Sequence, residues 1–449
     1  MANVIKIKKG LDINLKGKAS DVLLNGGKSD SYAIVPDYYN GIVPKVVAKV
    51  GEKVKAGSVL MIDKNRPEIK FVSPVSGEVT AVNRGEKRKV LSVVVKPEAQ
   101  IEYEDFGKKN VASLKREEVK EAILHAGMWP FIKQRPYDIV ASPADEPRDI
   151  FVSAFYSAPL APNFDFVVKG QEVDFQTGLD ALAKLTDGKV YVGIRKGSSV
   201  SVKGVETVEV EGPHPAANVG VQINHIKPIN KGEVVWTVNP ADVIVIGRLF
   251  NKGIADFSRL VVITGSETTE RGYVKAIAGC TIASLGDGKI MRGNEDIRII
   301  SGNVLTGTKV EKNDYLGAYD NQITVIPEGD ETHDFFGWAT PGFGKFSVSH
   351  SFPAWLMGKN KEYVIDARIK GGKRAMIMSN EYDSVFPMDI MPEYLLKAII
   401  AFDIDKMENL GIYEVAPEDF ALCEFVDTSK LEIQKIVRQG LDVLYKEMN

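Results

Sequence analysis

Two short segments combine aromatic rings with polar groups that could bind a flat, largely apolar ligand. They are 36–42 (PDYYNGI) and 128–137 (MWPFIKQRPY). Stacked rings offer such a ligand an apolar slot, and a few hydroxyl or guanidinium donors can fix its orientation. The candidate contact residues are Tyr38, Tyr39, Trp129, Phe131, Arg135 and Tyr137.

The second segment sits where an α/β domain would place a phosphate-binding loop, between a predicted helix and a predicted strand. A loop of that kind needs glycines, so that backbone N–H groups can converge on the anion. Only Gly127 could serve here, and a single glycine after a helix is more simply its C-terminal cap. Aromatic bulk beside Lys133 and Arg135 therefore argues against a dinucleotide as the ligand.

Other catalytic signatures are missing from the sequence. It has no G-x-S-x-G motif, and its histidines are not spaced as metal ligands. His214 and His225 form the closest pair and lack a third ligand. Cys280 and Cys423 are the two cysteines of the chain, too few for a disulfide framework or a cysteine-ligated cluster. We predict no catalytic residue and no metal site.

Composition narrows the class of protein. The chain has 449 residues, enough for about three domains. A net charge of -3 argues against nucleic acid as the main ligand. No apolar run approaches the roughly 20 residues needed to cross a bilayer, and the N-terminus lacks a signal peptide. We expect a soluble, cytoplasmic protein that could lie against a membrane complex.

Residues 1–100 are predicted to be all-β, with short β-branched runs separated by glycines. Within them, 50–60 reads V-G-x-x-V-x-x-G-x-x-L and 73–79 reads S-P-x-x-G-x-V. These motifs resemble lipoyl and biotinyl domains, which implies a small barrel-sandwich hybrid.

Residues 101–257 alternate strands and helices, which predicts a Rossmann-like α/β domain without a phosphate loop. Ser113 is expected to cap its first helix, and the runs DVIVIG (242–247) and VVWTV (234–238) are expected to be strands. Residues 258–330 predict a β-grasp domain of the soluble ligand-binding type.

The last third of the chain changes character twice. Residues 331–384 form an irregular connecting segment rich in glycine and aromatic residues, of a kind that usually packs over an interface or a site. Residues 385–449 predict a helical domain, and Ser429 with Glu432 forms a capping box before its last helix.

This order of domains resembles the large soluble subunit of Rnf-type electron-transfer complexes and, in part, the flavin- and NADH-binding subunit of respiratory complex I. In those relatives the α/β loop reads like G-G-A-G-F-P-T, and the tail carries C-x-x-C-x-x-C and C-P motifs for iron–sulfur clusters. Here the loop reads HAGMWPF (125–131), and the tail reads ALCEFVDTSK (421–430) with Cys423 alone. One thiolate cannot hold a cluster that needs four.

A chain that lacks both the glycine-rich loop and the iron–sulfur cysteines resembles the A-subunit family of Na⁺-translocating NADH:quinone reductases. Stretches along nearly the whole chain match that family, including KFVSPVSGEVTAVNRGEKR, GPHPAANVG and RIISGNVLTGT. The resemblance implies a six-protein, sodium-pumping complex in which FAD, FMN, riboflavin and the Fe–S centre belong to partner subunits. This chain would bind none of these cofactors. It would lie on the cytoplasmic face of the bacterial inner membrane, chiefly against the membrane-embedded B subunit.

The resemblance gives the flat ligand a chemical identity, because the substrate of such a complex is a quinone. A quinone head is planar and apolar with two carbonyl acceptors, which suits the six candidate residues. The family implies a supporting role in converting semiquinone to quinol, coupled in the whole complex to Na⁺ export. Two alternatives stay open. The aromatics could dock another protein of the complex in a purely structural scaffold, or the chain could be a degenerate dinucleotide-binding protein.

Overall fold

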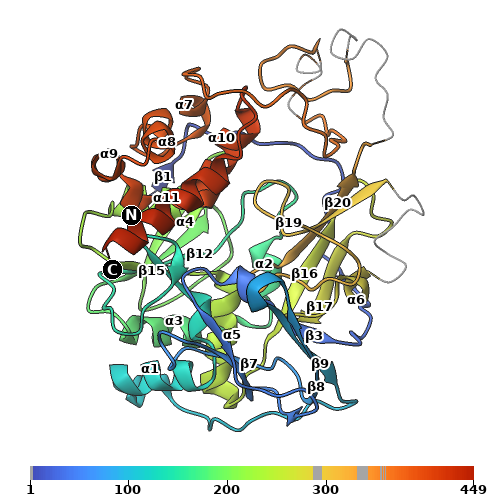
Figure 1. Ribbon diagram of the computed structural model, residues 1–449, viewed down its shortest axis with the longest axis vertical. Coiled ribbons are helices and arrows are strands. Elements are labelled where there is room, and N and C mark those ends of the chain that lie inside the picture. The colour runs from blue at the N-terminus through green and yellow to red at the C-terminus, as the bar shows by residue number, and fades with distance from the viewer. Residues whose placement is uncertain are drawn as a thin grey trace.

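The computed structural model describes residues 4–286, 296–330, 342–353, 356, 358 and 360–448 (Figure 1). Across these ranges the α/β part is built on a seven-stranded sheet in the order β1-β14-β13-β12-β15-β10-β11. The central strand β12 pairs in parallel with β13 and β15, whereas β10 is antiparallel to both of its neighbours. In sheet order the strands are Val4–Lys6, Glu206–Glu211, Val190–Arg195, Ile150–Ser153, Val235–Val238, Ile132–Arg135 and Ile139–Val140.

Helices cover both faces of this sheet. Successive residues of β12 point to opposite sides, so Ile150 packs with α3 and α5, while Phe151 packs with α4 and the C-terminal helices. This is the layered arrangement that alternating strands and helices predict. The helices of the α/β part are α1 (Arg116–His125), α2 (Phe164–Val168), α3 (Glu172–Lys184), α4 (Val219–Ile226) and α5 (Pro240–Lys252).

The prediction of a strand at 242–247 is wrong, because this segment lies inside α5. Residues 240–250 are all buried, and 243–246 form a continuous run of valine and isoleucine, which is equally typical of a buried strand. Pro240 begins the helix, and Gly253, with φ of 74°, ends it. Gly247 lets α5 approach α3 closely, since an added Cβ would lie 1.7 Å from a backbone oxygen of α3.

Two predicted helix caps are also wrong. The Ser113 hydroxyl donates to a backbone oxygen in the preceding turn, and α1 begins after Lys115, whose N–H donates to the Glu118 carboxylate. The Ser429 hydroxyl donates to a backbone oxygen of a distant loop. The Glu424 carboxylate instead accepts from a backbone N–H in the first turn of α11.

The N-terminal domain contains two packed sheets, as a barrel-sandwich hybrid requires. One has the order β3-β9-β8-β5 and the other β4-β6-β7. Strands β1 and β2, which precede them in sequence, pair with the α/β sheet and the third sheet instead. The hybrid strands are β3 (Tyr32–Ile34), β4 (Pro44–Val46), β5 (Lys53–Val54), β6 (Val59–Asp63), β7 (Lys70–Val72), β8 (Gly77–Arg84) and β9 (Val90–Pro97).

The third sheet is mixed, with the order β19-β18-β20-β16-β17-β2, and carries the short helix α6 (Ile282–Gly286). It lies at the right of Figure 1, beside the hybrid domain. Its hydrophobic residues join one continuous core with those of the hybrid and α/β parts. The strands are β2 (Leu23–Leu24), β16 (Ser258–Thr264), β17 (Gly272–Ile277), β18 (Ile297–Ser301), β19 (Thr308–Val310) and β20 (Gln322–Pro327).

The C-terminal helices pack on the face of the α/β sheet that is opposite to α3 and α5, where they form a second hydrophobic core (Figure 1). Of the predicted irregular segment, residues 331–341, 354, 355, 357 and 359 lie outside the described residues. Between 360 and 381 the chain forms no regular helix or strand. The helices that follow are α7 (Tyr382–Val385), α8 (Pro392–Ile400), α9 (Ile404–Asn409), α10 (Ala421–Val426) and α11 (Ile433–Met448).

Candidate functional site

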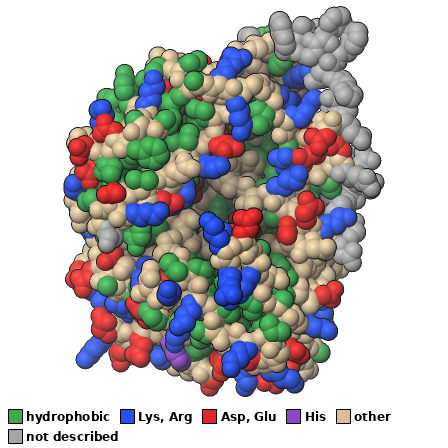
Figure 2. All heavy atoms as spheres, in the orientation of Figure 1, with side chains coloured by type: hydrophobic (Ala, Val, Ile, Leu, Met, Phe, Trp, Pro, Cys, Tyr) green, Lys and Arg blue, Asp and Glu red, His purple; other side chains and the backbone are tan. Residues whose placement is uncertain are grey.

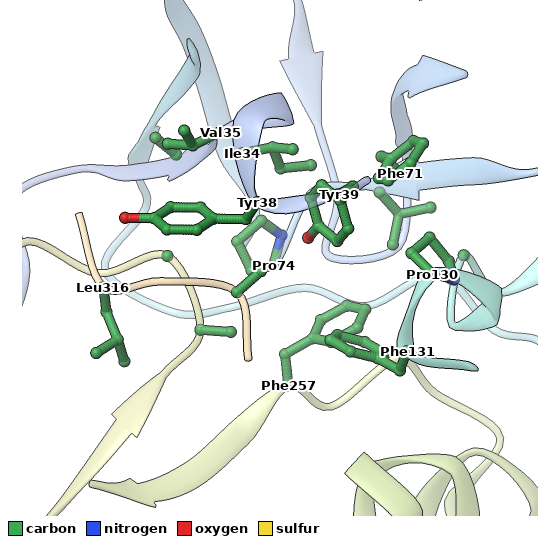
Figure 3. Close-up of a pocket in the computed structure, with 16 residues that line it drawn as sticks. Ile34, Val35, Tyr38, Tyr39, Phe71, Pro74, Pro130, Phe131, Phe257 and Leu316 are labelled. Atoms are coloured by element: carbon green, nitrogen blue, oxygen red, sulfur yellow. The ribbon is translucent and has the colours of Figure 1, made fainter. Parts of the chain in front are cut away.

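An aromatic cleft lies where the hybrid, α/β and mixed-sheet domains meet (Figure 3). The hybrid domain contributes strand β7 and the short helix η1 (Pro36–Tyr38), and the α/β domain contributes the short helix η4 (Trp129–Phe131). The mixed-sheet domain supplies the third wall. The principal lining residues are Ile34, Tyr38, Tyr39, Phe71, Pro74, Pro130, Phe131, Phe257 and Leu316.

Most ring pairs in and beside the cleft pack edge to face, which is a favourable arrangement of aromatic quadrupoles, and Phe131 and Phe257 are tilted at 48°. Tyr39 meets Phe71 at 4.7 Å and 65°, and Tyr319 at 5.6 Å and 70°, measured between ring centroids and planes. Phe131 lies 5.9 Å from Phe257 and 6.2 Å from Tyr319. The cluster thus joins all three domains through side chains rather than through a shared sheet.

Two hydroxyl groups make the cleft polar at one side. In Figure 3 the Tyr39 hydroxyl points into the space above Phe131, and the Tyr38 hydroxyl points away along the wall. Burial, reinforced by the nearby carboxylate of Asp320, raises the pKa of Tyr38 to about 12. Burial also raises the pKa of Tyr39 well above its usual value. Both hydroxyls therefore keep their protons and remain hydrogen-bond donors at neutral pH.

The free space in the cleft is small. It holds about 40 Å³, and since one water needs roughly 10–15 Å³ on this measure, a few waters would fill it. A substituted quinone ring enters only if side chains such as the half-buried Tyr38 move aside. The cleft is therefore narrow in this conformation.

A buried ion pair lies behind the floor of the cleft. Arg259 donates from Nη2 to Asp242 Oδ1 at 3.0 Å and from Nη1 to the Ala318 oxygen at 3.1 Å. Its guanidinium carbon lies 5.8 Å from the centroid of the Phe131 ring. Asp242 Oδ2 and Arg259 Nε have no hydrogen-bond partner among the described residues. Such orphaned buried atoms usually mark an unseen water or a functional site.

The Asp242 carboxyl predicts a specific pH dependence of stability. Burial raises its pKa from 3.8 to about 6, against the opposing effect of Arg259. The folded protein then holds this proton more tightly than the unfolded chain, so the contribution is full below pH 3.8 and is lost as pH rises through 6. Relative to Asp242→Asn, the free energy of unfolding of the unmodified chain should fall by on the order of 2 kcal/mol across this window. Urea unfolding at a series of pH values measures it, and parallel pH profiles of the two proteins would refute it.

The structure brings three of the six predicted contact residues together. Tyr38, Tyr39 and Phe131 line the cleft although the first two are remote from the third in sequence. Trp129 does not line it, because its side chain is fully buried in the α/β core. There its Nε1 donates to the Ala141 oxygen at 2.7 Å, and its ring meets Trp236 edge to face at 5.3 Å.

Arg135 and Tyr137 lie on the other side of the α/β sheet, against the C-terminal helices. Arg135 donates from Nη1 to Asp419 at 2.8 Å and from Nη2 to Glu418 at 3.1 Å. The Tyr137 ring meets the ring of Tyr445 in α11 at 5.2 Å. These two residues attach the helical domain to strand β10 and its turn.

Several residues of the cleft were not among the sequence candidates. Phe71 belongs to a run that the sequence identifies as a strand, and Phe257 precedes β16. Arg259 lies within that same apolar-looking strand. Nothing in the local pattern of these residues distinguishes them from ordinary core positions, since their common location depends on the packing of three domains.

The expected place of a phosphate loop also differs in the structure. Residues 126–131 join α1 to β10, which runs antiparallel to β15, so they do not follow the carboxyl end of a parallel strand. In open α/β sheets ligands bind where the strand order reverses, here between the ends of β12 and β15. That edge holds Tyr156 and Asp242, which bond to Asn321 and Arg259 of the next domain. A dinucleotide there would have to displace these contacts.

The potential metal ligands of the chain are scattered among the described residues. Among them, no group of three or more His, Cys, Asp or Glu side chains is placed to hold a metal ion. Cys280 and Cys423 are both buried, and they lie in different hydrophobic cores. The Cys423 thiol is accordingly held neutral, because burial raises its pKa. Across the same ranges, none of the helices is both long and apolar enough to span a bilayer.

Three family models match consecutive parts of the chain. Residues 5–98 match the NqrA N-terminal barrel-sandwich hybrid domain, residues 114–255 the NqrA second alpha/beta domain, and residues 260–312 the NQRA C-terminal domain. These matches agree with the hybrid, α/β and mixed-sheet domains of the structure. They confirm the predicted fold class.

Full-length relatives are similar over almost the entire chain. The A subunit of the Na(+)-translocating NADH-quinone reductase of Neisseria meningitidis is 36% identical over 450 residues, covering 99% of this chain and 100% of the relative. The protein of the same name from Vibrio atlanticus is 37% identical with the same coverage. Among solved structures, an NAD⁺-reducing nickel–iron hydrogenase in the H₂-reduced state has a TM-score of 0.37 and 11% identity, over 75% of this chain and 62% of that chain. That structural similarity is too low to bear on function.

Proposed function

This chain belongs to the NqrA family, the A subunits of Na⁺-translocating NADH-quinone reductases, and from this premise we propose that it contacts the quinone ring during reduction. The chain supports the conversion of semiquinone to quinol, which the whole complex couples to Na⁺ export. NADH oxidation, FAD, FMN, riboflavin and the Fe–S centre belong to partner subunits. The chain works on the cytoplasmic face of the bacterial inner membrane, docked on the membrane-embedded B subunit.

One observation carries the proposal. Two segments far apart in sequence, 36–39 and 129–131, converge with a third domain on an aromatic cleft. A quinone ring is flat and apolar with two carbonyl oxygens, so it needs ring faces and at least one donor. Phe131 and Phe257 supply ring faces, and the Tyr39 hydroxyl supplies a donor that points into the space.

Tyr39 also suits the chemistry of the last reduction step. A semiquinone anion that becomes quinol takes up negative charge on its oxygens before it is protonated. A fixed hydroxyl donor in a water-poor cleft stabilises that charge. Behind the floor, Arg259 pairs with Asp242, bonds to the Ala318 backbone and lies against the Phe131 ring, which supports the ring face of the cleft.

A purely structural scaffold is the second candidate function, and a separate surface favours it. Four exposed hydrophobic side chains lie within α8 and at its two ends, and the buried side of this helix is also apolar. Hydrophobic side chains gather over the C-terminal helices at the upper left of Figure 2. Exposed aromatic and methionine side chains are typical of protein interfaces. The four side chains are Met391 (62% exposed) just before α8, Tyr394 (57%) and Ile400 (46%) within it, and Phe402 (64%) just after it.

Binding of a short-chain quinone to the isolated chain tests the proposal. We expect a saturable change in tryptophan fluorescence, because Trp129 adjoins the cleft residue Pro130. Tyr39→Phe should weaken binding about 2- to 10-fold, the loss of one hydrogen bond. Phe131→Leu should weaken it further by removing a ring face. Tyr445→Phe, which alters a hydroxyl outside the cleft, is the matched control and should bind as the unmodified chain does.

The same variants in the whole complex separate the two functions. Cleft variants should raise the KM for quinone while the complex remains assembled. If quinone neither binds the chain nor responds to Tyr39→Phe, and Tyr394→Ala with Phe402→Ala releases the chain from its partners, the scaffold function stands instead. Binding of NADH to the isolated chain at micromolar concentration would contradict both the quinone-contact and the scaffold function, and would indicate a dinucleotide-binding protein.

A further inference from the structure

The sheet β4-β6-β7 of the hybrid domain has an outer face whose side chains are exposed or half-buried. Its strand register places Lys45 opposite Ile62, and Ile62 opposite Lys70. Residues directly opposite in an antiparallel pair point to the same side, so these three form one row across the sheet. Val43 and Val47 lie two positions either side of Lys45 and share its face. We call these five residues the outer sheet face.

This face mixes exposed apolar and basic side chains. Val43 is 44% exposed and Val47 is 43% exposed, and Val50 just beyond the strand is 62% exposed. Lys49 and Lys64 are exposed at its edges. Large exposed β-branched residues on one sheet face are unusual in a free protein surface, because their burial against a partner would be favourable.

The charge of the domain is strongly one-sided. Residues 43–97 contain twelve Lys and Arg but five Asp and Glu, a net of +7 in a chain whose total is -3. Among the described residues, Lys45, Lys49 and Lys70 form no salt bridge, whereas Lys55, Arg66 and Lys89 do so elsewhere in the domain. Lys and Arg side chains lie among hydrophobic ones over the lower part of the visible surface (Figure 2).

We propose that the outer sheet face rests on the anionic headgroups of a lipid bilayer. Lysines near such a surface are attracted by its negative potential, and apolar side chains between them enter the boundary between headgroups and acyl chains. The charge complements that of an anionic leaflet. A membrane is also at hand, because the chain belongs to a family of Na⁺-translocating complexes.

The composition of the face favours lipid over a protein partner. Energetically dominant residues of protein interfaces are enriched in Trp, Tyr and Arg, and the outer sheet face has none of these. Its apolar residues, Val43, Val47 and Ile62, are short and branched. The Asp63 carboxylate, which accepts from the Val43 N–H at 3.0 Å, is fully buried and paired with Arg66, so it adds no exposed negative charge to the face.

The inference holds whether or not a quinone binds the aromatic cleft, although the two surfaces are related. Lys70 belongs to the outer sheet face, and its neighbour Phe71 points through the sheet into the cleft. Only the thickness of one sheet separates the proposed lipid contact from the aromatic rings. Contact with lipid would hold the cleft close to the phase in which quinones dissolve.

Vesicle flotation with the full chain tests the proposal. The chain should float with vesicles of phosphatidylglycerol and phosphatidylcholine, should not float with phosphatidylcholine alone, and should be released by high salt. The triple variant Lys45→Glu, Lys49→Glu and Lys70→Glu should lower binding at least tenfold. A second variant, Val43→Thr, Val47→Thr and Val50→Thr, keeps the charge and the β-branching. It should lower flotation at intermediate salt, where the electrostatic attraction is screened and apolar contact contributes more.

The matched control reverses three exposed lysines of the other domains, Lys169→Glu, Lys275→Glu and Lys312→Glu. It changes the net charge of the chain by the same amount and should leave flotation within about twofold. Equal loss in both triple variants would mean that overall charge, not this face, attracts lipid. The proposal would be overturned if the unmodified chain did not float with the anionic vesicles. It would also be overturned if variants of the outer sheet face floated normally but were purified in smaller amounts with the other proteins of the complex. Thermal unfolding of each variant shows that it is folded.

Discussion

Replacing Arg135 by methionine is expected to lower the free energy of unfolding by about 3–5 kcal/mol, the usual consequence of breaking a buried pair from one side. The Arg135 side chain is 1% exposed, and the Asp419 side chain that it meets is fully buried. Methionine fills much of the same volume but leaves the Asp419 carboxylate uncompensated. Urea unfolding measures the change.

The effect should also be local to one domain boundary. Arg135 lies on β10 of the α/β sheet, and Asp419 lies in a short turn before α10, so their contact attaches the C-terminal helices. Proteolysis of the variant should therefore begin in the segment that joins these helices to the rest of the chain. Adding Asp419→Asn should recover part of the lost stability by removing the unpaired charge.

Arg298→Met is the matched control for Arg135. Arg298 also pairs with a carboxylate, Glu328, but its side chain is 31% exposed. Exposed pairs contribute about 0–1 kcal/mol, so this variant should be close to neutral. If Arg135→Met cost no more than Arg298→Met, the buried pair would not be what attaches the helical domain.

The second large effect is expected for Trp129→Ala, which should destabilise the chain by about 3–5 kcal/mol. The ring is fully buried against Trp236, and its indole N–H donates to the Ala141 oxygen. Truncation leaves a cavity and an unsatisfied carbonyl in the α/β core. Phe402→Ala, at an aromatic residue that is 64% exposed, is the control and should change stability by less than about 0.5 kcal/mol.

Functional data on these aromatic residues need the stability of each variant beside them. A loss of quinone reduction in Trp129→Ala would report on folding, whereas the same loss in a stable Tyr39→Phe variant would report on the cleft. The two can be separated by measuring activity well below the unfolding temperature of each variant. Retained stability in Trp129→Ala would show that the ring is not a core residue.

Sequence patterns predict the type of most elements where one face of an element is buried and the other is solvated. Helix α3 shows this, because Phe175, Leu179 and Leu182 recur at helical spacing and are buried. Helix α5 resembles a strand in sequence for the opposite reason. Residues 240–250 are all buried, and the run of valine and isoleucine at 243–246 is equally typical of a buried strand.

The sequence predicts only the part of the candidate site that lies within short aromatic segments. Aromatic residues on an exposed-looking turn, such as Tyr38 and Tyr39, proved to line the cleft. Trp129 and Phe131 are two residues apart, and their directions are set by the short helix η4, which turns one into the core and the other into the cleft. The partners Phe71 and Phe257 depend on the contact between domains, which a local pattern does not contain.

The placement of strands β1 and β2 bears on how the chain is made in the cell. Val4 pairs with Glu209 and Leu23 pairs with Tyr273, so both strands belong to sheets whose other strands leave the ribosome much later. At roughly 5–20 residues per second, translation leaves these strand edges without partners for on the order of ten seconds or more. The α/β and mixed-sheet domains thus cannot complete their sheets until segments about 200 residues or more further along the chain have been made.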